Sequence, residues 1–309
     1  MSLDLSVRAQ SSLTPSIEDA IFETLVYSDI FDYPLSPAEL HRYLPVPASL
    51  DAVERALRHP GSRIGTAEGF YFLAGRDNLV EQRHKRNIDS NRPFRQAVRF
   101  GRVLGGLPFI RMVGLTGSLA LRNAERTADI DYLIIAEHGR LWTARAFALL
   151  FGRATSSLGY TLCPNLILSD QHLEWEPKDL YSARELCQMI PLAGSENYSR
   201  LRQANAWTQG LLPNAAAAPN ESSRIPPGSI LQHLAEMPLR GSLSDQLEAW
   251  EMNRKIRRFR RLAGFGTETV FNENLCQGNF NHHALQTRSA LRERLRMLGF
   301  EMRSAPPTP

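Results

Sequence analysis

The stretch from Val113 to Ile135 reads VGLTGSLALRNAERTADIDYLII and decides the fold of this chain. Gly117 and Ser118 form a turn before a short helix, where free backbone N–H groups, a hydroxyl group and the helix dipole favour phosphate oxygens. Asp129 and Asp131 begin a strand, in which residues i and i+2 point to the same face. Two carboxylates placed in this way predict a site for a hard divalent cation beside a phosphate group.

The residues around this stretch predict strands that alternate with helices. Phe109 to Leu115 is expected to form a strand, and Ser118 to Asn123 a short helix. Ile130 to Ala136 is an apolar run rich in Ile, which is typical of a buried strand. Thr161 to Leu168 is the next expected strand. Together these segments predict an α+β fold with a small mixed sheet.

This pattern resembles the signature of the polymerase-beta-type nucleotidyltransferase superfamily. That signature is a Gly-Ser or Gly-Gly turn followed, after a short interval, by Asp, an apolar residue, a second acid and an apolar residue. The matching residues are Gly117, Ser118, Asp129, Ile130, Asp131 and Tyr132. Thr116 stands where the family has an apolar residue, which is a mild departure. The resemblance covers roughly residues 105 to 170.

The resemblance implies an enzyme that transfers a nucleoside monophosphate from a nucleoside triphosphate to an acceptor and releases pyrophosphate. Asp129 and Asp131 would be the catalytic residues and the ligands of Mg²⁺ or Mn²⁺. Gly117, Ser118 and Arg122 would contact the nucleotide phosphates. The acceptor is left open among a small molecule, RNA and a protein.

The third metal-facing acid of the family has no obvious counterpart. The strand expected over Thr161 to Leu168 contains no acid, so the candidates for a third ligand are Asn165 within it and Asp170 just after it. An asparagine carbonyl can ligate a cation but brings no charge. This gap favours an alternative function, a catalytically weak or inactive nucleotide- or DNA-binding regulator. A scaffold role for the N-terminal region is a third possibility.

The N-terminal region predicts three helices and a hairpin. Ser36, Pro37 and Glu39 are a helix start with a capping box. Ile64 to Leu73 reads as two short strands about a turn. Over residues 17–76 this order resembles a winged helix-turn-helix domain, which makes DNA a candidate partner. The third helix, however, mixes acids with its basic residues, namely Asp51, Glu54, Arg55 and Arg58.

The remaining organisation follows from composition and helical spacing. We expect flexible tails at residues 1–16 and 304–309. Between the N-terminal region and the C-terminal tail we expect a basic linker helix at 77–104, the nucleotidyltransferase core at 105–176, and a mainly helical region at 177–303 with a loop near 213–229.

Composition predicts a cytoplasmic protein without a membrane partner. Of the 309 residues 43% are hydrophobic and 22% charged, and no apolar run approaches the ~20 residues of a membrane span. The first residues lack a signal-peptide core. The three cysteines are widely spaced, which favours buried thiols over a zinc site or a disulfide framework.

Basic residues gather in two clusters within a chain of net charge +4. The range from Glu81 to Arg102 contains seven basic residues and only two acids. A second basic cluster lies between Arg254 and Arg261. Each cluster predicts either contact with phosphates or a solvated helix face.

Overall fold

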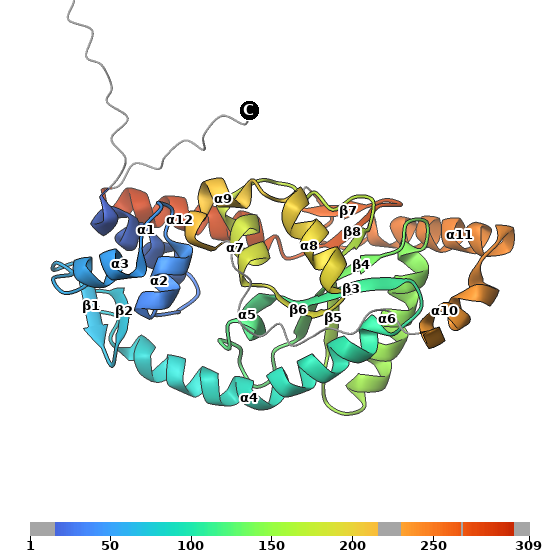
Figure 1. Cartoon of the computed structure of the whole chain (residues 1–309), viewed down its shortest axis with the longest axis horizontal. Helices are drawn as coiled ribbons and strands as arrows, with labels where there is room; N and C mark the ends of the chain where they lie inside the picture. Colours follow the sequence, from blue (N-terminus) through green and yellow to red (C-terminus); the bar gives the residue numbers. More distant parts are fainter. Residues whose placement is uncertain (1–15, 216–229, 267, 300–309) are drawn as a thin grey trace, which may run out of the picture.

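The computed structural model describes residues 16–215, 230–266 and 268–299. In this part of the chain the fold is α+β, with a two-stranded hairpin and a six-stranded mixed sheet. Figure 1 shows an elongated molecule, with the hairpin and the first helices at one end, the sheet at the other, and helix α4 running beneath both.

The N-terminal unit consists of the three expected helices and the hairpin. The elements are α1 (Ile17–Asp29), α2 (Pro37–Tyr43), α3 (Leu50–Ala56), β1 (Ile64–Ala67) and β2 (Phe70–Leu73). The capping box of Ser36 and Glu39 starts α2 as predicted. A bridge between Leu35 and Tyr71 ties the start of α2 to the hairpin. The core of the N-terminal unit is a cluster of buried apolar residues that includes Ile21, Leu25, Leu40, Leu44 and Val53.

Helix α4 (Asn78–Gly105) joins this unit to the sheet. Its buried residues, among them Phe94, Ala97 and Leu104, pack into the core of the sheet. Pro93 lies inside the helix and removes one backbone N–H donor. Figure 1 shows that α4 is bent and follows the lower edge of the molecule.

The sheet has the strand order β6-β3-β4-β5-β8-β7. Its strands are β3 (Ile110–Leu115), β4 (Ile130–Ala136), β5 (Leu162–Ser169), β6 (Ile190–Ala193), β7 (Thr269–Phe271) and β8 (Leu275–Gly278). Strands β4 and β5 run parallel, and the other neighbouring pairs are antiparallel. Because a parallel pair needs a crossover, helix α6 (Leu141–Ser156) connects β4 to β5.

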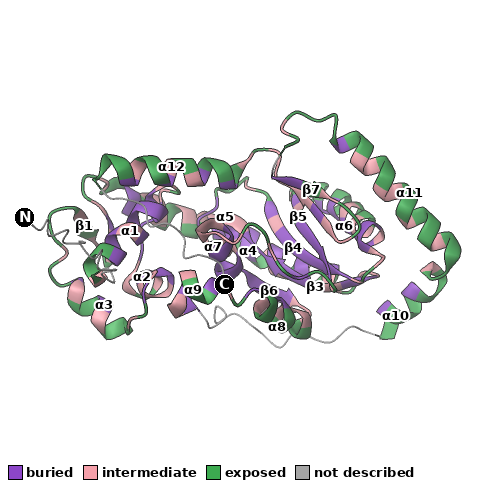
Figure 2. Ribbon diagram, turned by 90° about the horizontal axis from the view of Figure 1, so that it is seen from above, coloured by how far each residue is buried: buried purple, intermediate pink, exposed green. Residues whose placement is uncertain are grey.

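The two faces of β4 pack into different clusters. Tyr132 and Ile134 belong to the cluster that includes residues of α4 and α6, and the Tyr132 hydroxyl donates to the carbonyl of Ala97 at 2.7 Å. Leu133 and Ile135 belong to the cluster on the opposite face. The period-2 alternation of a strand accounts for this division. In Figure 2 most of the length of β3, β4 and β5 is coloured as buried.

The region 177–303 is helical over most of its described length, but it also supplies β6, β7 and β8. That contribution was not expected, because strands of three or four residues are too short to show a period. The helices and turns are α7 (Leu180–Gln188), α8 (Ser195–Ala204), α9 (Thr208–Leu211), η1 (Pro213–Ala215), α10 (Ile230–Glu236), η2 (Met237–Leu239), α11 (Ser242–Phe259) and α12 (His283–Met297). Helix α12 returns to pack on α1, as Figure 1 shows.

Both predicted tails lie outside the described residues, except for Ser16, which caps α1. So does the predicted loop near 213–229, apart from residues 213–215 in η1. None of the helices in the described ranges combines the length and apolar character that a membrane crossing requires.

A buried glutamate fastens α10 to the start of β3. The side chain of Glu236 is fully buried and accepts hydrogen bonds from the Phe109 N–H at 2.7 Å and from Arg111 at 2.7 and 2.9 Å. Arg240 adds a bond at 3.1 Å. Burial alone would raise the pKa of Glu236, but the bonds from Arg111 and Phe109 outweigh it and lower the pKa to about 2.

We expect Glu236→Gln to lower the free energy of unfolding by about 2–4 kcal/mol at pH 7, because Arg111 loses a buried anionic partner. Because the pKa of Glu236 is lowered in the folded state, its ionised carboxylate stabilises the protein at pH values above the ordinary pKa. This stabilisation is lost as the pH falls towards 2. Urea unfolding between pH 7 and pH 3 should therefore show a steeper acid loss in the wild type than in the variant. Parallel curves would contradict the assignment.

Candidate functional site

The Gly117-Ser118 turn lies directly against Asp131. Strands β3 and β4 pair Leu115 with Tyr132, and the next backbone N–H, that of Thr116, donates to the carbonyl of Asp131 at 3.0 Å. Gly117 follows with φ of +66°, and a Cβ there would lie 2.5 Å from Asp131 Oδ2. The position therefore requires glycine for both its backbone conformation and its missing side chain.

The two aspartates flank a buried residue at the start of β4. Asp129 is exposed, Asp131 is half-buried, and Ile130 between them points into the core. Burial and the negative charge of Asp129 raise the pKa of Asp131 to about 6, partly offset by a hydrogen bond from the Cys163 thiol. The two carboxylates are therefore within electrostatic reach of each other, as the spacing i and i+2 predicts.

A third carboxylate comes from α7, which the sequence pattern did not indicate. Glu185 accepts a hydrogen bond from the backbone N–H of Gly117 and another from Gln188 at 2.6 Å. Burial and the charge of Asp131 raise its pKa to about 7. Its sequence neighbour Arg184 does not neutralise it, because that guanidinium lies over the rings of Tyr27 and Tyr43 at 4.5 and 4.3 Å. No spacing rule connects a glutamate on a later helix to Gly117.

Cys163 stands beside Asp131 on the neighbouring strand. The parallel register of β4 and β5 pairs these two residues directly. Burial and the charges of Asp131 and Asp129 raise the pKa of the Cys163 thiol to about 12. The position on β5 nearest to the aspartates therefore carries a neutral hydrogen-bond donor instead of an acid.

The two third-ligand candidates from the sequence do not lie beside Asp131. Asn165 is exposed and occupies the irregularity of β5, between the partners of Tyr132 and Leu133. Asp170 follows the far end of β5, where its backbone N–H donates to the carbonyl of Ala136 at 2.9 Å. Ala136 lies five positions along β4 from Asp131, or about 17 Å at the usual rise. The expectation that Asp170 ligates the same cation is therefore wrong.

Ser118 and Arg122, the other two residues predicted to contact phosphates, differ in how far their side chains are engaged by the fold. The side chain of Ser118 is exposed next to Gly117. The guanidinium of Arg122 lies 3.9 Å over the ring of Phe94 and donates to Asn91 Oδ1 at 3.0 Å. Arg122 thus contacts α4 through Phe94 and Asn91, and its contact with a nucleotide phosphate stays a prediction.

The three acids form a region of uncompensated negative charge. No lysine or arginine in the described ranges forms an ion pair with Asp129, Asp131 or Glu185. Those ranges also contain no group of three or more His, Cys, Asp or Glu side chains already arranged to hold a metal ion. Mg²⁺ usually binds through one or two carboxylates and completes its shell with water and substrate phosphates. Asp129 and Asp131 suit this mode of binding, in which a divalent cation would relieve their repulsion.

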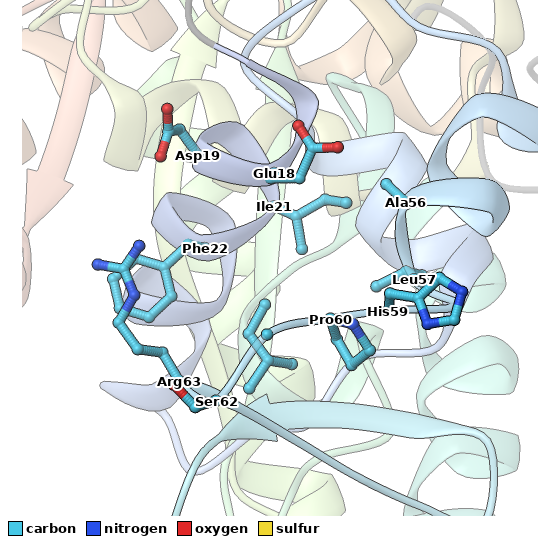
Figure 3. A pocket seen from close by; sticks show the side chains of 12 residues that line it. Glu18, Asp19, Ile21, Phe22, Ala56, Leu57, His59, Pro60, Ser62 and Arg63 are labelled. Atoms are coloured by element: carbon cyan, nitrogen blue, oxygen red, sulfur yellow. The ribbon is translucent and has the colours of Figure 1, made fainter.

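Two cavities lie outside the acidic cluster. One of about 260 Å³ is next to α5 (Gly117–Ala120) and is lined by Ala120, Arg122 and Arg83, among others. Another of about 290 Å³ lies in the N-terminal unit, between α1 and the end of α3. In Figure 3 the guanidinium of Arg63 lies against the ring of Phe22 at this second cavity, 4.2 Å from its centroid. Neither cavity is lined by the three acids.

Searches of protein-family models, of curated proteins and of solved structures find no match to this chain. The geometry of the site and the sequence pattern therefore carry the functional argument.

We expect Glu185→Gln to stabilise the protein at pH 8 by on the order of 1 kcal/mol, because it removes a half-buried charge beside Asp131. A raised folded-state pKa means that stability falls as pH rises from the ordinary value, 4.5, towards about 7. Thermal unfolding should show a higher Tm for the variant at pH 8 and little difference at about pH 4.5. The exposed Glu125→Gln is the control and should show no such trend. A pH-independent difference would contradict the placement of Glu185.

Proposed function

We propose that this chain is a Mg²⁺-dependent nucleotidyltransferase that moves a nucleoside monophosphate from a nucleoside triphosphate to an acceptor. The observation that carries the proposal is the contact between Gly117 and the carboxylate of Asp131. It joins the two halves of the sequence motif at one point. A phosphate that approaches the Gly117-Ser118 turn therefore also approaches Asp131.

The order of elements around this contact supports a nucleotidyltransferase core. Helix α4 precedes β3, the short helix α5 precedes β4, α6 precedes β5, and α7 follows. The antiparallel β3–β4 pair and the parallel β4–β5 pair form a mixed sheet. A small mixed sheet is what the resemblance led us to expect.

In the proposed reaction an acceptor hydroxyl attacks the alpha-phosphorus and pyrophosphate leaves. Magnesium held by Asp129 and Asp131 would supply charge neutralisation for the triphosphate and lower the pKa of a bound hydroxyl. The protein otherwise contributes positioning and electrostatics. Gly117 lets the phosphates come close to the backbone, and the exposed hydroxyl of Ser118 is available to donate to them.

Glu185 is the third carboxylate in this proposal. Its bond to the Gly117 N–H orients the turn relative to Asp131. Its position on α7 makes the site depend on a helix outside the expected core of residues 105–176. The acid therefore reaches the site from a different element than the strand of the family pattern.

A second candidate function is a regulator that binds nucleotide without efficient turnover. The specific observation in its favour is Cys163, a neutral thiol at the β5 position beside Asp131. A thiol brings no negative charge there, so a second cation would bind less tightly than in a site with three acids on the sheet.

The N-terminal unit supports a winged-helix proposal. Three helices precede a hairpin. The bridge between Leu35 and Tyr71 pairs a further segment of the chain with strand β2 of this hairpin. The outward residues of α3 are of both charges, with Asp51 and Glu54 exposed beside Arg55. A protein partner fits this mixed surface better than a DNA backbone does.

We expect Asp129→Asn and Asp131→Asn each to weaken Mg²⁺-dependent ATP binding by at least about tenfold. Asparagine has nearly the shape of aspartate, but it lacks the negative charge that binds the cation. Isothermal titration calorimetry with ATP and Mg²⁺ gives this affinity. A pyrophosphate-release assay with each nucleoside triphosphate then tests turnover in the wild type and both variants.

The matched control is Asp170→Asn, which removes one carboxylate at the far end of β5 and should bind ATP as the wild type does. Thermal unfolding verifies that all variants are folded. Wild-type affinity in both Asp129→Asn and Asp131→Asn would refute the metal site. Binding without pyrophosphate release for any triphosphate would favour the regulator.

A further inference from the structure

Helix α4 carries a row of five basic residues and one isoleucine on its outer face, which we call the outer stripe. Its members are Lys85, Ile88, Arg92, Arg95, Arg99 and Arg102. Successive members are three or four residues apart, which places them on one side of an α-helix. All six side chains are exposed. At a rise of 1.5 Å per residue the stripe is about 25 Å long.

Four cations of the outer stripe, Lys85, Arg92, Arg95 and Arg99, make none of the internal contacts that other basic residues of α4 make. Arg83 pairs with Glu39 at 2.8 Å and Arg86 donates to Asn123 at 3.3 Å, so both serve internal contacts. Lys85, Arg92, Arg95 and Arg99, by contrast, form no ion pair or side-chain hydrogen bond with any described residue. Four charges are therefore free in a line.

Acids do not balance this charge along the stripe. The acids of α4 are Glu81, in its first turn, and the half-buried Asp89, and neither belongs to the stripe. The exposed neighbours Asn87 and Asn91 are neutral amides that can bond to phosphate or sugar oxygens.

We propose that the outer stripe binds the sugar–phosphate backbone of a nucleic-acid strand. Evenly spaced cations in a single line suit the evenly spaced charges of a phosphodiester chain. A membrane-surface helix would need a broad apolar face. The stripe contains only Ile88, and the apolar residues Phe94, Ala97 and Leu104 are buried against the sheet. This inference goes beyond the proposed transferase activity and does not require turnover.

The test is fluorescence anisotropy with labelled 20-nucleotide RNA and DNA, single-stranded and duplex, over a series of salt concentrations. The stripe variant is R92A/R95A/R99A in the full chain. The charge-matched control is R257A/R258A/R261A, which removes three exposed arginines of the second basic cluster. A third variant, R92K/R95K/R99K, keeps the stripe charge.

We expect the stripe variant to bind at least about tenfold more weakly than the wild type, with the lysine variant and the control within about threefold of it. The slope of log affinity against log salt should fall by about 2 for three lost contacts to a single strand. Asp131→Asn should bind as the wild type does, so failure of the transferase proposal leaves this result unchanged.

Three outcomes would overturn the inference. One is an equal loss of affinity in the stripe variant and the charge-matched control, which would indicate a net-charge effect. Another is the absence of wild-type binding to every nucleic acid at 50 mM salt. The third is stripe-dependent binding to phosphatidylserine vesicles without binding to nucleic acid.

Discussion

The close approach of Gly117 to Asp131 is the constraint on which the rest of the candidate site depends. The backbone bond from Thr116 to Asp131 extends the β3–β4 pairing by one step and brings the turn to the carboxylate. Any side chain at position 117 would occupy the space of Asp131 Oδ2. The same turn donates its N–H to Glu185, so one glycine locates acids from a strand and from a helix.

The acidic site contrasts with the way this protein treats charge elsewhere. Glu236 is fully buried but receives bonds from Arg111 and Arg240. Asp29 is likewise bonded to Arg76 and Arg294. At the site, carboxylates raise each other's pKa without a cationic partner among the described residues. Such local departures from charge pairing are expected at functional sites, where stability is given up for binding or chemistry.

Helix α4 serves the fold with one face and solvent with the other. Its inner residues close the core of the sheet, and Phe94 also receives the guanidinium of Arg122. That stacking ties Arg122 to α4, although Arg122 follows the Gly117-Ser118 turn by only a few residues. In the outer stripe Lys85, Arg92, Arg95 and Arg99 form no ion pair with a described residue, so this face of the helix presents positive charge to solvent.

The sequence by itself determined what depends on local period and spacing. It located the turn at Gly117, the two aspartates that flank Ile130 at the start of β4, the start of α2 and the long helix α4, because each follows from a few consecutive residues. Only the tertiary structure decided that Glu185 of α7 approaches Gly117, that Asp170 lies past the far end of β5, and which arginines of α4 make internal contacts. These features depend on strand register and on packing between elements remote in sequence, and no local pattern encodes either one.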